Sequence, residues 1–174
     1  MSFDLNRREL FKALTGGALA ATLQLPAAEP NAPLFFSKDE FALLNTLTEI
    51  IIPTDNHSPG AREAGVAAYI DRRVAEAFLA KEKDEWRDGL AAINTVSQQM
   101  FQGSFDKITP QQQADVLAKL VKNERNPQTE PEKFFAQLKQ TTAFAYYSSR
   151  IGIHQEIEYK GNIILDKFVG FDAS

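Results

Sequence analysis

Apolar side chains recur at helical spacing through most of the chain. The first such stretch follows Ser37, which can form a helix-capping pair with Glu40, and it ends at Pro53. One face of this predicted helix carries Phe41, Leu44, Leu47 and Ile51. Residues 53–60, "PTDNHSPG", are dense in turn-forming residues and predict a loop.

The same spacing predicts four further helices. The second of the four should end near Gly103, the third should begin at Thr109 with Pro110 and Gln112 completing a cap, and the fourth should open at Pro131. Their predicted buried positions are, in chain order, Val66, Ile70, Val74 and Phe78; Trp86, Leu90, Ile93, Met100 and Phe101; Val116, Leu117, Leu120 and Val121; Phe134, Phe135, Leu138, Ala145 and Tyr146.

These elements predict an all-α fold, a single compact domain of about five helices. The charged run 81–85 is expected as an exposed turn or as the polar start of a helix. From Arg150 onward the sequence has glycines and no sustained period, so we expect an irregular C-terminal tail that packs over the helices or onto a partner.

The N-terminal residues 1–28 have the composition of an export signal, and residues 29–174 then form the helical domain. Basic residues precede an uncharged segment from Ala13 to Leu25, and small residues follow at Ala27 and Ala28. The segment is too short to span a bilayer and only weakly apolar, which favours a twin-arginine signal, read by a translocase that moves folded proteins. The residues that form the pattern are Arg7, Arg8, Leu10, Phe11 and Lys12. The alternative is an amphipathic N-terminal helix with two solvated arginines.

Composition narrows the function of the 174-residue chain. Its formal net charge is −4, and residues 1–28 hold more basic than acidic side chains, so the remainder is more acidic and nucleic acid is not an expected partner. The chain has no cysteine, which excludes attached c-type haem, thiolate-bound iron–sulfur clusters and a cysteine nucleophile. No glycine-rich phosphate-binding pattern occurs, so we expect no cofactor in this chain.

Two groups of polar residues are candidates for chemistry. Asp55, His57 and Glu63 lie near one loop and could hold a divalent metal, but their spacing matches no standard ligand motif, so a structured loop is the favoured interpretation and no metal site is expected. Asp71 and its neighbours Arg72 and Arg73 could line a pocket, but a solvated helix face with local ion pairs is favoured.

Some aromatic side chains could lie at the surface, although most are expected in the core. The candidates are Phe134, Phe135, Phe144, Tyr146 and Tyr147. Thirteen phenylalanines in a chain of this size leave room for an exposed patch that a partner covers.

The N-terminal pattern followed by "LTEIIIPTDNHSPGAREAGVAAYID" resembles the small subunit, subunit 3, of gluconate 2-dehydrogenase and related membrane-bound, flavin-dependent sugar dehydrogenases. A second matching segment is "FAYYSSRIGIHQEIEYKGN", an aromatic-rich stretch that closes on a Tyr-x-Gly element. The residues in these segments that we take as candidates for a partner interface are Pro53, Asp55, His57, Pro59, Tyr146, Tyr147, Tyr159 and Gly161.

The resemblance implies a non-catalytic accessory subunit. In such complexes a large flavoprotein of the glucose–methanol–choline (GMC) type carries FAD and performs the oxidation, and a multihaem cytochrome c commonly takes the electrons. The small subunit carries the export signal for both proteins. The resemblance therefore implies a periplasmic location, reached in the folded state and membrane-associated through the complex. Two alternatives remain: a stand-alone periplasmic enzyme using the region of Asp55, His57 and Glu63, and a free-standing helical binding module.

Overall fold

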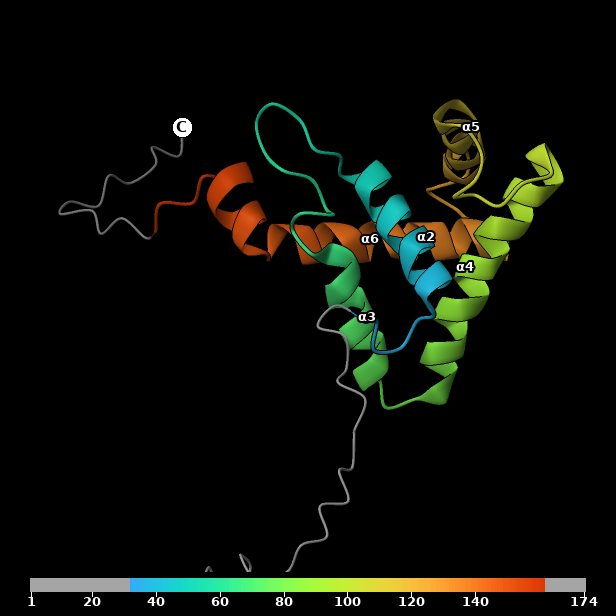
Figure 1. Ribbon diagram of the computed structural model, residues 1–174, viewed down its shortest axis with the longest axis horizontal. Helices are drawn as coiled ribbons and strands as arrows, with labels where there is room; N and C mark the ends of the chain where they lie inside the picture. Colours follow the sequence, from blue (N-terminus) through green and yellow to red (C-terminus); the bar gives the residue numbers. More distant parts are fainter. Residues whose placement is uncertain (1–31, 162–174) are drawn as a thin grey trace, which may run out of the picture. The chain divides into compact units, whose positions relative to one another are not determined.

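The computed structural model (Figure 1) describes residues 32–161, which contain five α-helices and one π-helical segment and no strand. The predicted all-α class is therefore confirmed for this part of the chain. The described residues from Pro33 onward belong to one compact unit. The predicted signal, with Arg7, Arg8, Leu10, Phe11 and Lys12, lies outside the described residues, as does the end of the tail from residue 162.

Local sequence signals set where three of the helices begin. Helix α2 (Lys38–Ile51) starts with the predicted capping box, in which the Ser37 side chain accepts from the Glu40 amide and the Glu40 carboxylate accepts from the Ser37 amide. Helix α5 (Pro110–Val121) starts with the second predicted box, formed by Thr109 and Gln112. Helix α6 (Glu130–Tyr147) has Pro131 in its first turn and a third box that the sequence analysis did not predict.

Glu132 closes that third box. Its carboxylate accepts from the amides of Thr129 at 3.0 Å and Gln128 at 2.8 Å, and from the side chain of Asn123 at 3.0 Å. These hydrogen bonds, led by the one from Thr129, lower the pKa of Glu132 to about 2. The charged carboxylate thus satisfies amides at the helix start that have no intrahelical partner.

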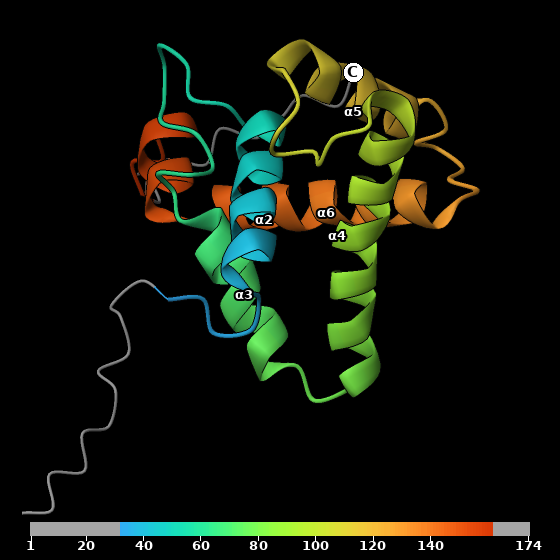
Figure 2. The same ribbon diagram turned by 45° about the vertical axis from the view of Figure 1, so that its right-hand side comes forward.

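Helix α6 runs across α2, α3 (Val66–Glu76) and α4 (Ala80–Phe101) in both views, with α5 at its N-terminal half (Figures 1 and 2). Trp86 of α4 packs edge-on against Phe134 of α6, with 5.4 Å between ring centroids, and against Phe36. Gly89 makes this approach possible, because a Cβ there would lie 2.1 Å from Cδ2 of Phe134. The core consists of the apolar faces of all five α-helices.

Two details of the predicted core differ from the structure. Phe78 is not buried: α3 ends at Glu76, Ala77 turns to an extended conformation, and the Phe78 side chain is 98% exposed. Met100, Phe101 and Val121 lie at the edge of the core and are only partly buried. The run 81–85 lies within the first turns of α4, which confirms the second of its two predicted alternatives, the polar start of a helix.

The tail is also more regular at its start than predicted. Residues Gly152–Glu156 form the π-helix η1, and the Ile157 amide donates to the Gly152 carbonyl at 2.9 Å. A wide turn of this kind has no 3.6-residue period, which is why the pattern gave no helical signal. Gly152 is required by contact, since a Cβ there would lie 2.1 Å from the carbonyl oxygen of Tyr146.

Among the residues that the structure describes, no helix has the length and apolar character needed to cross a membrane.

Candidate functional site

The loop between α2 and α3, residues 52–65, contains four of the eight partner-interface candidates. Its base is closed by backbone contacts: the Ala61 amide donates to the Ile52 carbonyl at 2.9 Å, and the Gly60 amide donates to the Thr54 hydroxyl at 2.8 Å. The Glu49 carboxylate accepts from the amides of Thr54 and Arg62. The loop is therefore held on both sides by the end of α2.

Asp55 organises the tip of this loop. One of its carboxylate oxygens accepts from the amides of His57 at 2.8 Å and Ser58 at 2.9 Å, and its own amide donates to the Ser58 carbonyl at 3.1 Å. The hydrogen bonds from Ser58 and then His57 lower the pKa of Asp55. An aspartate used in this way fixes a turn, because one of its carboxylate oxygens is engaged by two backbone amides.

A cluster of polar side chains joins the loop to the end of α6 and to η1. The buried Tyr146 hydroxyl, on a residue only 1% exposed, donates to the Pro59 carbonyl at 2.7 Å, and the Ser58 hydroxyl donates to the Glu156 carboxylate at 2.5 Å. The two hydroxyl oxygens are 2.9 Å apart. Each hydroxyl carries one proton, and both protons are already donated, to the Pro59 carbonyl and to the Glu156 carboxylate. The contact between the two hydroxyl oxygens is therefore the second branch of a bifurcated hydrogen bond.

His57 lies against the same segment. Its Nε2 is 3.2 Å from the Glu156 carbonyl oxygen. This hydrogen bond raises the pKa of His57, and the negative charges of Glu156, Glu158 and Asp55 act in the same direction. The protonated ring is therefore the form that the folded loop favours.

The remaining candidates are divided between the interior and the surface. Tyr146 holds the loop from within, so its side chain is not available at the surface of this conformation. Tyr147 and Tyr159 are about half exposed, Pro53 and Asp55 are exposed, and Gly161 adopts a left-handed φ of 92°. Glu63 is exposed and makes no hydrogen bond to the loop among the described residues, where no group of three acidic or histidine side chains is placed to hold a metal ion.

Asp71 has a different role from the solvated one predicted. It is 2% exposed, and its carboxylate accepts from three consecutive amides, those of Leu34 at 2.5 Å, Phe35 at 3.0 Å and Phe36 at 2.9 Å. Arg87 supports the same segment, because its guanidinium donates to the Phe35 carbonyl and lies 4.2 Å from the centre of the Phe35 ring. The segment before α2 is thus fixed onto α3 and α4.

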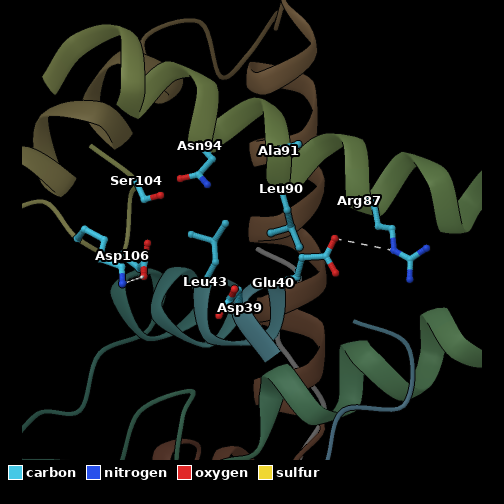
Figure 3. Close-up of a pocket in the computed structure, with 10 residues that line it drawn as sticks. Asp39, Glu40, Leu43, Arg87, Leu90, Ala91, Asn94, Ser104 and Asp106 are labelled. Atoms are coloured by element: carbon cyan, nitrogen blue, oxygen red, sulfur yellow. Dashed lines mark ion pairs between the residues drawn. The ribbon is translucent and has the colours of Figure 1, made fainter. Parts of the chain in front are cut away.

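A polar groove of about 320 Å³ lies between α2, α4 and the connection from α4 to α5 (Figure 3). Four of its charged groups form two ion pairs, Glu40 with Arg87 at 3.9 Å and Asp106 with Lys107 at 3.9 Å, and Asp39 adds a further carboxylate. Leu43, Leu90 and Ala91 are its apolar lining, and Asn94 and Ser104 add uncharged polar groups.

Comparison with known protein families identifies the helical unit. The family model of gluconate 2-dehydrogenase subunit 3 matches residues 38–162. The chain belongs to this family. The match begins at the first residue of α2 and includes every described helix, so the subunit 3 family corresponds to the helical unit and not to the N-terminal segment. No curated protein and no solved structure matches the chain.

Membership confirms the resemblance drawn from the sequence and makes the chain an accessory subunit of a multisubunit dehydrogenase. A subunit of a complex contacts other subunits, so the relevant feature of this surface is where such a contact can form. The sequence predicted the loop at residues 53–60 from its turn-forming residues, and it did not single out the turn between Asp55 and Ser58. It missed Ser58 and Glu156 as a pair, because they are 98 residues apart.

Proposed function

We propose that this chain escorts a flavin-dependent catalytic subunit through twin-arginine export and then stabilises it in the periplasm. The observation that carries the proposal is the membership of residues 38–162 in the subunit 3 family, since a subunit of a dehydrogenase complex acts through its partners. The N-terminal pattern around Arg7 and Arg8 adds the export role.

The two features together give a physical reason for the escort. A non-covalently bound FAD must enter its protein before export, because an unfolded chain cannot hold it. A route for folded proteins would then let one signal serve both subunits. In this proposal the partner is a large GMC-type flavoprotein that carries FAD, a multihaem cytochrome c accepts the electrons, and the complex is associated with the membrane.

Replacement of Arg7 and Arg8 together by Lys tests the export role. Because the twin-arginine translocase reads the arginine pair, we expect both subunits to accumulate in the cytoplasm of cells that coexpress them. Cell fractionation followed by immunoblotting of each subunit measures this. The control is Arg62→Lys, the same replacement at an exposed position of the helical unit.

Export of both subunits at the wild-type level by the double variant would contradict the signal assignment. The accessory role has a separate test: the purified chain without its partner is expected to show no flavin absorbance and no sugar-acid oxidation, whereas the coexpressed complex shows both. Substantial turnover by the isolated chain would contradict that role.

A further inference from the structure

Two neighbouring helices present an exposed aromatic cluster. Tyr69 of α3 and Phe144 of α6 have ring centroids 6.4 Å apart, and Tyr147 follows one turn later on α6. The exposed fractions are 42%, 58% and 45%. We call these three residues the aromatic face. Figures 1 and 2 show the beginning of α3 next to the C-terminal half of α6, so the fold brings the face together from segments distant in sequence.

The exposed area is large enough to need an explanation. With about 200 Å² for a whole aromatic side chain, the three rings expose roughly 300 Å². This is comparable to the largest apolar patch on a typical monomer, and such patches are often functional. A standard interface buries about 800 Å² on each partner, so the aromatic face would form its centre rather than its whole extent.

Two arginines lie on α3 beside this face. Arg72 and Arg73 follow Tyr69 by three and four residues, which places them one helical turn further along the same side of α3. Both are exposed, and neither takes part in an ion pair within the described residues. In a chain with a net charge of −4, an adjacent pair of unpaired arginines is a local positive patch.

We propose that the aromatic face with Arg72 and Arg73 is the surface on which the catalytic subunit docks, and that the partner's matching surface is an apolar patch bordered by carboxylates. The inference rests on the proposed function, since it locates the contact that the escort requires. Tyrosine, phenylalanine and arginine are enriched at protein interfaces, and a few buried aromatic residues usually dominate the binding energy. The three rings sit on packed helices, so little side-chain freedom is lost on binding.

A second exposed apolar pair provides a matched control. Phe78 and Leu79, between α3 and α4, are 98% and 61% exposed. No cluster of positive charge adjoins them, because the run 81–85 that follows mixes lysines with acids. The double variants Tyr69→Gln/Phe144→Gln and Phe78→Gln/Leu79→Gln remove exposed apolar area from two different places. The second removes the larger area, so lost area alone cannot explain a selective effect of the first.

The experiment coexpresses each affinity-tagged full-length variant with the flavoprotein and measures the amount of flavoprotein that co-purifies. We expect Tyr69→Gln/Phe144→Gln to lower it by about tenfold or more and Phe78→Gln/Leu79→Gln to leave it near the wild-type level. Arg72→Glu/Arg73→Glu, which changes only exposed charges, should weaken binding most at low salt. Thermal unfolding of each purified variant checks that it is folded.

Each outcome is informative. Wild-type retention of the flavoprotein by both the aromatic and the arginine variants would overturn the inference, as would selective loss in the Phe78→Gln/Leu79→Gln variant. If the wild-type chain itself retains no flavoprotein, the proposed function fails and the docking surface fails with it. The wild-type sample therefore separates the two failures.

Discussion

At the residue scale, Thr142 is an unusual position in the core of α6. It is fully buried, and its hydroxyl has no hydrogen-bond partner within the described part of the chain. Thr142→Val keeps the shape and β-branching while removing the unpaired polar group. We expect the free energy of unfolding to rise by about 1 kcal/mol, because an unsatisfied buried hydroxyl costs about that much or more. Urea unfolding followed by far-UV circular dichroism measures this.

The adjacent Thr141 provides the control for that measurement. Its hydroxyl donates to the Gln137 carbonyl at 2.9 Å, so Thr141→Val removes a hydrogen bond instead of relieving an unpaired group. We expect no gain in stability from this change. An equal gain from both variants would mean that valine itself, and not the removal of the buried hydroxyl, causes the effect at position 142.

The sequence could predict the role of a residue where its hydrogen-bond partner lies nearby in the chain. Ser37 and Thr109 were predicted as caps because their partners lie three residues away, within one helical turn. The role of Asp71 was not predicted, because the three amides that donate to its carboxylate lie 35 to 37 residues earlier in the chain. A carboxylate followed by two arginines looks like part of a solvated helix face, and only the packing of residues 34–36 against α3 reveals that it is buried.

At the element scale, the loop and η1 form one assembly whose connection depends on pH. The folded state raises the pKa of His57, mainly through the hydrogen bond to the Glu156 carbonyl. The stabilisation by His57 is therefore fully present below the unfolded-state pKa of about 6.5 and is lost as the pH rises through the higher folded-state pKa. Amide hydrogen exchange in residues 55–60 should accordingly show protection, corrected for intrinsic rates, that falls above about pH 6.5.

His57→Gln should remove most of that pH dependence, because glutamine carries no titrating charge. The chain has only one other histidine, His154, so His154→Gln is the matched control and should retain the wild-type pH profile. A profile that follows His154 would show that the other imidazole governs the loop. A profile unchanged in both variants would show that no histidine does.

Element boundaries were predicted well where the chain carries its own stop signal and less well elsewhere. Pro53 and the Thr109–Pro110 pair mark their helix ends in sequence. The apolar spacing of Val66, Ile70 and Val74 continues to Phe78, although the helix ends two residues before it, because periodicity carries no information on where a backbone turns. The π-helix η1 was missed for the related reason that its wide turn has a different period.

At the scale of the whole molecule, no disulfide contributes to stability, since the chain has no cysteine, and core packing matters correspondingly more. Contacts between α4 and α6 contribute strongly, and they depend on the absence of a side chain at Gly89. If export uses a route for folded proteins, the folded fraction of this subunit should limit the export of the pair. Under this condition, weakening a core contact should lower the amount of complex that is exported.

Gly89→Ala tests the link. A Cβ at position 89 would lie 2.1 Å from the Phe134 ring, and the overpacking, at about 1–3 kcal/mol, should exceed the gain of about 1 kcal/mol in helix propensity. We expect lower stability in urea and a several-fold smaller periplasmic amount of both subunits, measured by fractionation and immunoblotting.

The control is Gly103→Ala, where the nearest atom is a methyl group of the Ile108 side chain at 2.9 Å. Excess flavoprotein should partly restore export of the Gly89→Ala variant, because binding favours the folded state by mass action. Full export of a variant shown to be less stable, without excess partner, would mean that folding of this subunit does not limit the route.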